Sequence, residues 1–83
     1  MFYVYLLYSY KDHNFYTGYT SDLKRRVKEH LNGEELSTKD RHPLELVYYE
    51  AYPKYKLAYA REYALKRRAK GWQELLKRLE IKM

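Results

Sequence analysis

Residues 14–30, NFYTGYTSDLKRRVKEH, change from a strand pattern to a helix pattern. The stretch FYTGY, residues 15–19, is rich in residues that favour β-strands. Thr20 or Ser21 is suited to cap a helix, and Asn32-Gly33 supplies a left-handed stop. The segment therefore predicts a strand over 15–19 and a helix from about 22 to 31.

The helix over 22–31 directs two polar residues toward the protein interior. At 100° per residue, Leu23, Val27 and Leu31 form an apolar stripe, and Arg26 and His30 fall on the same side. An arginine that points toward the interior needs either a partner for its charge or a function that requires it there. The residues predicted to point away are Lys24, Arg25, Lys28 and Glu29.

Two further strands complete a small sheet. FYVYLLY, residues 2–8, is a short apolar run typical of a central strand, and it is predicted to pair with 15–19 as an antiparallel hairpin that makes Tyr5 and Tyr16 neighbours. LELVYYEAY, residues 44–52, predicts a third strand, ended by Pro53. Residues 34–43, between the predicted helix over 22–31 and this third strand, are predicted to form a mobile polar loop.

The last third of the chain is predicted to be helical. A helix over about 54–69 is expected to bury one side, with Glu62 at the edge of that side. A final helix has core spacing and is assigned packing only. The fold class is therefore α/β, a three-stranded antiparallel sheet flanked by helices in the order β-β-α-β-α-α. The residues expected on the buried sides of these two helices are Leu57, Ala58, Ala60, Ala64 and Leu65 for the first helix, and Trp72, Leu75, Leu76 and Leu79 for the second.

Composition limits the class of protein. The chain of 83 residues is long enough for one domain, spanning 1–83, and it has no cysteine for a disulfide or a thiolate metal site. It has no apolar run long enough to span a membrane and no signal peptide, so a cytoplasmic location is expected.

The charge of the chain favours a polyanionic partner. Seventeen Lys and Arg against eleven Asp and Glu give a net charge of +6, which attracts nucleic acid, and twelve tyrosines offer rings on which bases can stack. The basic runs are KRRVK, residues 24–28, and KRRAK, residues 66–70. The predicted nucleic-acid-binding residues are Arg25, Lys28, Lys66, Arg67 and Lys70.

Five short motifs follow one another along the chain. Tyr3-Val4-Tyr5 and Tyr16-Thr17-Gly18 lie in the first two predicted strands, SDLKRRVKEH carries Arg26, STKDRHPLELVYYE spans a loop and a strand, and AREYALK carries Glu62. Together they resemble the GIY-YIG nuclease domains, in particular the small stand-alone members related to the N-terminal nuclease module of the excision-repair protein UvrC. The first two stretches resemble the two motifs that name the family, although the first lacks its glycine and has valine in the middle. SDLKRRVKEH resembles the motif helix with its arginine, AREYALK places Glu62 at the family's glutamate, and STKDRHPLELVYYE resembles the loop and strand of small members.

The resemblance implies a metal-dependent endonuclease that hydrolyses DNA phosphodiester bonds, in repair or recombination. The implied catalytic residues are Tyr5, Tyr16, Arg26, His30 and Glu62, with Glu62 holding one Mg²⁺ or Mn²⁺ ion. The chemistry suits these residue types, because Mg²⁺ takes one or two carboxylates plus waters and phosphate, and arginine offers a planar fork to phosphate oxygens. Either tyrosine could position water or act as general base.

Other interpretations remain open. Tyr5 could be a core strand residue, Arg26 could pair with Glu29 or Glu62, and Glu62 could bridge to Lys66, in surface pairs worth about 0.3–0.5 kcal/mol. Larger family members also carry a separate DNA-binding domain that residues 71–83 do not resemble. The chain could then be a nucleic-acid-binding module that acts on branched or damaged DNA with a partner protein, or a small protein-interaction domain.

Overall fold

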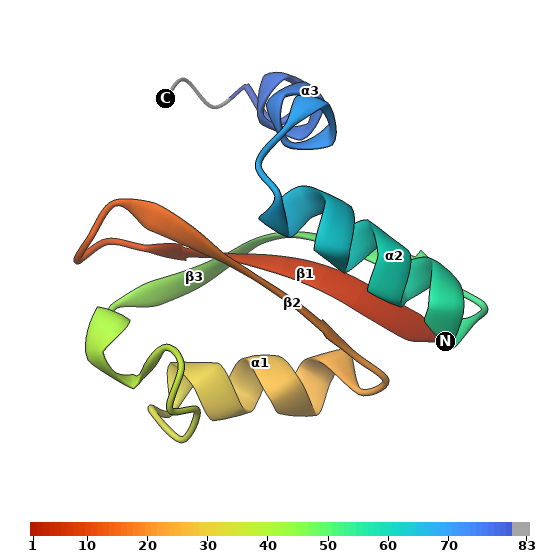
Figure 1. The fold of residues 1–83 in the computed structure, drawn as a ribbon. Coiled ribbons are helices and arrows are strands. Elements are labelled where there is room, and N and C mark those ends of the chain that lie inside the picture. Colours follow the sequence, from red (N-terminus) through yellow and green to blue (C-terminus); the bar gives the residue numbers. More distant parts are fainter. Residues whose placement is uncertain (81–83) are drawn as a thin grey trace.

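A computed structural model, which describes residues 1–80, contains a three-stranded antiparallel sheet (Figure 1). Strand β1 (Phe2–Ser9) is central, with β2 (Asn14–Thr20) on one side and β3 (Leu44–Tyr52) on the other. All three strands lie where the sequence predicts them, and β1 and β2 form the expected hairpin. The α/β class and the order β-β-α-β-α-α are confirmed.

The register of the sheet separates two sets of side chains. Tyr5 lies opposite Gly18 of β2 and opposite Tyr49 of β3. Because side chains alternate along a strand, Tyr5 and Leu7 face one side of the sheet, whereas Val4 and Leu6 face the other.

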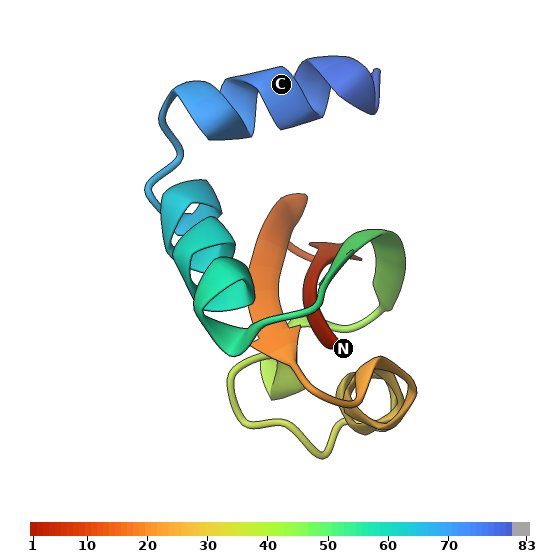
Figure 2. The same cartoon turned by 90° about the vertical axis from the view of Figure 1, so that its right-hand side faces the viewer.

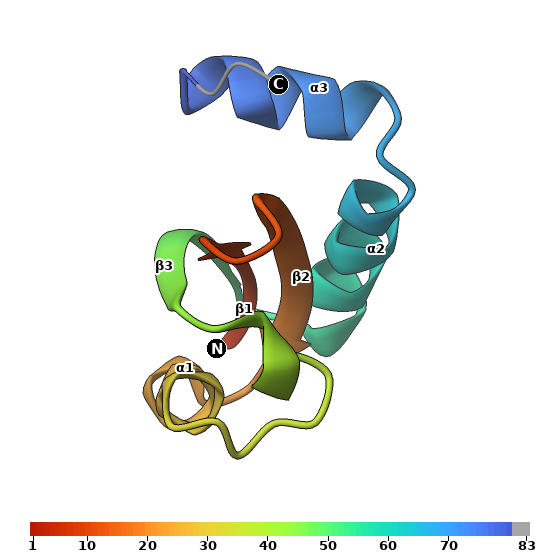
Figure 3. The same ribbon diagram turned by 90° about the vertical axis from the view of Figure 1, so that its left-hand side faces the viewer.

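The helices cover the two faces unequally (Figures 1, 2 and 3). Helix α1 (Leu23–Leu31) lies against one face, and α2 (Tyr55–Lys66) and α3 (Lys70–Arg78) lie on the other. The apolar core is on the α2–α3 side, where Trp72, Leu75 and Leu76 are buried as predicted and Leu79 packs against them. The buried members of this core are Val4, Leu6, Phe15, Ala58, Leu65, Trp72, Leu75 and Leu76.

Helix α1 has only part of the apolar stripe that the sequence predicts, because Leu23 and Val27 are half-buried but Leu31 is exposed. His30 is its one buried residue, and Leu31 is 47% exposed. The inward direction is centred on His30, so Leu31, about 100° further round, turns to solvent. The cap is also different from the prediction, because Asp22, and neither Thr20 nor Ser21, accepts the backbone N–H of Arg25. The predicted stop is present, with Gly33 at φ +74°.

Helix α2 is rotated relative to its predicted face and is shorter. Its buried residues are Ala58, Glu62 and Leu65, so the charged residue assigned to the edge lies within the buried stripe. The helix ends at Lys66 because Arg68 adopts a left-handed conformation with φ 54°, where the sequence has neither glycine nor proline. The residues wrongly expected to be buried are Leu57, Ala60 and Ala64.

The segment 34–43, predicted to be a mobile polar loop, contains regular structure and a buried residue. It contains a short 3-10 helix, η1 (Lys39–Arg41), and Thr38 is fully buried. Ser9 of β1 donates its hydroxyl to the carbonyl oxygen of Arg41 at 2.6 Å, which ties the segment to the sheet. Among residues 1–80 there is no helix with the length and hydrophobicity needed to cross a bilayer.

Candidate active site

A buried chain of three polar side chains links the sheet to α1 and to the following loop. Tyr5 Oη lies 2.9 Å from His30 Nε2, and His30 Nδ1 lies 2.7 Å from Thr38 Oγ1. Tyr5 is 1% exposed, and His30 and Thr38 are 0% exposed. A neutral imidazole has one donor and one acceptor nitrogen, so the chain is satisfied in either direction along its length. We call it the Tyr5–His30–Thr38 chain.

Burial sets the protonation of this chain. Burial, and next the nearby Tyr16, raise the pKa of Tyr5 to about 12, although Arg26 acts in the opposite direction. Burial, together with the positive charge of Arg26, lowers the pKa of His30. At neutral pH the phenol therefore keeps its proton and the imidazole is uncharged.

Tyr16 completes an aromatic cluster on this face. Its ring centroid is 6.4 Å from that of Tyr5 and 5.1 Å from that of His30, so the predicted proximity of the two tyrosines is confirmed. Tyr16 is only partly buried, and no protein group within residues 1–80 bonds to its hydroxyl. Of the two phenols, that of Tyr16 is the one accessible to water or substrate.

Gly18 makes room for the Tyr5 ring. A Cβ atom at this position would collide with Oη and Cζ of Tyr5. The glycine of the second motif is therefore required so that the phenol of the first motif can lie across β2. The close neighbour of Gly18 is therefore the Tyr5 ring.

Arg26 is held by two carboxylates. Its Nη1 lies 3.2 Å from Glu29 Oε1 and 2.7 Å from Glu35 Oε2. Burial opposes the charge of Arg26, but hydrogen bonding to Tyr5 and Glu29 outweighs it, and the pKa of Arg26 is raised. Nη1 is the guanidinium atom that contacts both carboxylates. The pairing of Arg26 with Glu29 is one of the interpretations that the sequence leaves open. The pairing of Arg26 with Glu35 could not be predicted from helical spacing, because Glu35 lies in the loop after α1.

Glu62 occupies the other layer of the molecule. It lies on α2 at 8% exposure, and its carboxylate is 3.1 Å from Lys66 Nζ, as the bridging interpretation expects. The phenol of Tyr19, whose ring packs against Tyr59 of α2, lies within range of the negative charge of Glu62. The polar partner of Glu62 within residues 1–80 is Lys66, and no hydrogen bond or ion pair there joins Glu62 to Tyr5, Tyr16, Arg26 or His30. No cluster of three or more acidic or histidine side chains suited to a metal occurs in the described chain.

The structure therefore divides the five predicted catalytic residues into two groups. Tyr5, Tyr16, Arg26 and His30, which we call the α1-face cluster, lie on one side of the sheet. Glu62 lies on the other side, above β2 and β1. Tyr16 belongs to β2, which is an edge strand of the described sheet.

The predicted nucleic-acid-binding residues are also divided. Arg25 and Lys28 are exposed on α1, and Lys66, Arg67 and Lys70 are exposed at the junction of α2 and α3. The two basic runs thus belong to helices on opposite faces and do not form one patch.

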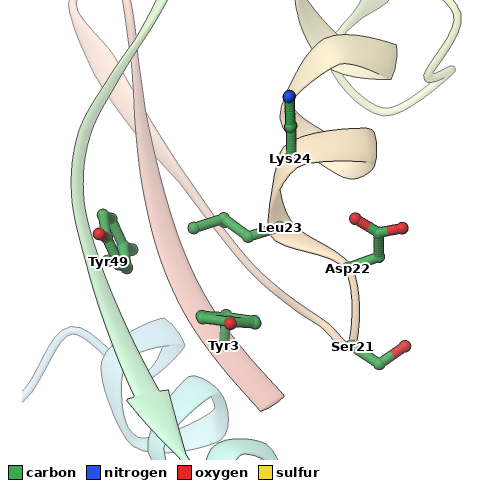
Figure 4. A pocket seen from close by; sticks show the side chains of 6 residues that line it. All are labelled: Tyr3, Ser21, Asp22, Leu23, Lys24 and Tyr49. Carbon is green, nitrogen blue, oxygen red and sulfur yellow. The ribbon is translucent and has the colours of Figure 1, made fainter. Parts of the chain in front are cut away.

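A shallow cleft of about 330 Å³ lies beside the N-terminus of α1 (Figure 4). Leu23 points toward the sheet between Tyr3 and Tyr49, and Lys24 is the one basic residue of its lining. None of the five predicted catalytic residues lines it. The remaining lining residues are Ser21 and Asp22.

Comparison with known proteins identifies the family. The family profile described as the GIY-YIG catalytic domain matches residues 1–74. The chain belongs to the GIY-YIG family. The resemblance seen in the motifs is thereby confirmed over nearly the whole chain, and the family is one of nuclease catalytic domains.

Similar GIY-YIG proteins are small. The UPF0213 protein of Clostridium perfringens is 43% identical over 68 residues, covering 81% of this chain and 72% of that protein. The UPF0213 protein YazA of Bacillus subtilis is 39% identical over 66 residues, covering 78% and 67%. A solution NMR structure of a UPF0213 protein from Bacillus halodurans has a TM-score of 0.58 and 40% identity, and covers 95% of this chain and 85% of that one.

Two site residues were missed by sequence reasoning. Thr38 lies in the stretch that resembles small GIY-YIG proteins, but nothing in its spacing shows that it bonds to His30. Glu35 is an acid in a polar loop, and only the fold of that loop brings it to Arg26.

Proposed function

We propose that this GIY-YIG domain is a divalent-metal-dependent endonuclease that hydrolyses phosphodiester bonds in DNA. The observation that supports the proposal best is the α1-face cluster, in which a fixed arginine, an accessible phenol and a buried tyrosine–histidine pair converge from three separate elements. A packing role alone does not require a buried, hydrogen-bonded histidine at the centre of a helix face.

Each member of the cluster has a distinct task. Arg26, with Nη1 fixed by Glu29 and Glu35, directs its other donors at the phosphate, where the negative charge increases in the transition state. Tyr16 positions the attacking water, because its hydroxyl is the accessible one. Tyr5 has a pKa of about 12 and a bond to His30, so it acts as a hydrogen-bond donor and not as the base.

The Tyr5–His30–Thr38 chain holds the Tyr5 phenol in place. When His30 Nδ1–H donates to Thr38 Oγ1, Nε2 is the acceptor for the Tyr5 hydroxyl, so no proton transfer is needed to satisfy the three groups. The lowered pKa of His30 keeps the imidazole uncharged at neutral pH, so that Nε2 can accept this bond.

Glu62 is the residue that would hold the metal ion. Mg²⁺ retains several waters and needs only one or two protein carboxylates, so one carboxylate is chemically sufficient even though the described residues contain no larger acidic cluster. The bound ion would supply charge neutralisation at the phosphate and a more acidic water. For Glu62 to take part, Lys66 must release the carboxylate, and the substrate must lie across the open edge of β2.

A second candidate is a nucleic-acid-binding module without efficient cleavage, which acts with a partner protein. The position of Glu62 on the opposite layer, bridged to Lys66, favours it. Under this alternative, DNA would bind in a salt-sensitive manner and would not be cut.

Cleavage of plasmid and branched DNA with Mg²⁺ or Mn²⁺ separates the two candidates. The nuclease proposal predicts nicking by the wild type and by a control variant, Glu74→Gln, at an exposed position of α3. Nicking should be lost in Glu62→Gln at every metal concentration. Metal-free DNA binding should persist in Glu62→Gln. Absence of nicking by the wild type at high enzyme concentration, or equal nicking by Glu62→Gln, would contradict the proposal.

A further inference from the structure

Three tyrosines form a row on the solvent side of α2. Tyr55, Tyr59 and Tyr63 are spaced four residues apart, so they follow one another along one side of the helix. They are 48%, 49% and 59% exposed. We call them the α2 tyrosine row. None of them belongs to the apolar core, and none has a role in the α1-face cluster.

The rings of this row are organised by their neighbours. Tyr55 and Tyr59 are stacked, with centroids 6.0 Å apart and planes at 27°. Tyr19 of β2 contacts both, at 5.7 and 5.8 Å between centroids, and its hydroxyl is 3.2 Å from that of Tyr55. The guanidinium of Arg67 lies 5.9 Å from the ring centre of Tyr63. These contacts limit ring motion before any ligand binds.

The surroundings of the row carry positive charge. Lys56, Lys66, Arg67 and Lys70 are all exposed on α2 or just after it. Glu62 is the one acid in the sequence of α2, and Lys66 already pairs with it. A second copy of this chain, with a net charge of +6, would be repelled by such a surface.

We propose that the α2 tyrosine row binds a single-stranded segment of nucleic acid by stacking its bases. Every base has a ring face that can stack on tyrosine, and flanking cations bind the backbone phosphates. Duplex bases are already stacked on one another, so the row selects unpaired bases. Two members of the row, Tyr55 and Tyr59, contact Tyr19 of the edge strand, and the Tyr19 phenol lies within range of the negative charge of Glu62.

This inference rests on the proposed function and adds a substrate preference to it, because the bound strand is taken to lead to the cleavage site. A strand on the row would pass Glu62 and reach the open edge of β2, where the α1-face cluster begins. The preferred substrate would then have a single-stranded region adjoining the bond that is cut, such as a flap or a gap.

Binding without metal tests the row independently of cleavage. The probes are a fluorescein-labelled oligothymidylate and a strand of the same length made of abasic residues, which has the phosphates but no bases. Fluorescence anisotropy at low salt, with chelator present, gives both affinities. We expect the wild type to bind the oligothymidylate more tightly than the abasic strand.

Substitutions test whether the α2 tyrosine row causes the preference for the oligothymidylate over the abasic strand. Tyr63→Ala, at the most exposed position, should weaken oligothymidylate binding roughly 5- to 150-fold and leave abasic binding unchanged. Tyr63→Phe should retain the wild-type affinity. Tyr10→Ala, which removes a 50% exposed tyrosine from the turn after β1, is the matched control and should have no effect.

Several outcomes would overturn the inference. Equal affinity of the wild type for the two strands would exclude base stacking, and wild-type binding by both Tyr63→Ala and Tyr59→Ala would place any stacking elsewhere. Absence of nucleic-acid binding would leave the row as a protein-binding face. Failure of the nuclease proposal is distinguishable, since Glu62→Gln would then cleave like the wild type while the binding preference persisted.

Discussion

Replacing Thr38 by valine removes one hydroxyl group and keeps the shape of the side chain. Thr38 is fully buried, and its Oγ1 lies 2.7 Å from His30 Nδ1. The substitution leaves a buried ring nitrogen without a partner, which costs about 1–3 kcal/mol. For a domain of this size, each kcal/mol lowers the melting temperature by about 4–8 °C. The expected decrease is therefore about 4 °C to more than 20 °C.

Thermal unfolding followed by circular dichroism measures the effect. Thr38→Ser, which keeps the hydroxyl and loses a methyl group, is the control and should be affected less than Thr38→Val. A Thr38→Val melting temperature within about 2 °C of the wild type, below the range just derived, would refute the reasoning, because His30 would then not depend on this bond. A larger loss in Thr38→Ser than in Thr38→Val would show that packing, and not hydrogen bonding, is what Thr38 contributes.

Further predictions concern the same face of the sheet. Gly18→Ala should destabilise the fold by about 1–3 kcal/mol in urea unfolding, since its Cβ would displace the Tyr5 ring. The control is Gly71→Ala, whose Cβ would have ordinary contacts. Equal stability of the two variants would contradict the close approach of the Tyr5 ring to Gly18. Because burial lowers the pKa of His30, the unfolded chain binds more protons than the folded one below about pH 6.5. Stability should therefore be complete above that pH and fall in acid by at most about 1.4 kcal/mol per pH unit. This slope should be reduced in His30→Gln and not in His13→Gln, and an unchanged slope in His30→Gln would assign the effect to another group.

The sheet could be predicted from the sequence because its signals are local. The apolar run of β1 and the aromatic-rich β2 and β3 fix the strands and their order. The motif residues Tyr5, Tyr16, Arg26 and His30 are also brought together as their strand and helix positions imply.

The helix faces could not be predicted as well, because polar or charged residues lie at their buried centres. In α1 the centre of the inward face is His30, which is stable there only because Tyr5 and Thr38 bond to it. In α2 the position of Glu62 within the buried stripe shifts the face away from Leu57. The buried face of a helix is predicted from the spacing of its apolar residues. A buried face that contains polar groups, stabilised by hydrogen bonds and ion pairs to distant parts of the chain, is therefore not predicted.

The partners Thr38 and Glu35 depend on the path of the loop after α1. Its residues are polar and predict no regular structure, yet the loop folds back so that Thr38 reaches His30 and Glu35 reaches Arg26. Such contacts follow from tertiary structure and have no periodic signal in the sequence.

The central claim is that the α1-face cluster stabilises the transition state of phosphodiester hydrolysis, and single-turnover cleavage by Arg26→Lys tests it most directly. Lysine keeps the positive charge and loses the planar fork, so DNA affinity should change little. The cleavage rate should fall roughly 10²- to 10³-fold, as is typical when one transition-state donor is removed. Arg25→Lys, on the exposed side of the same helix, should cleave at the wild-type rate. If Arg26→Lys cleaves as fast as Arg25→Lys, Arg26 is an ordinary surface cation and the claim is contradicted.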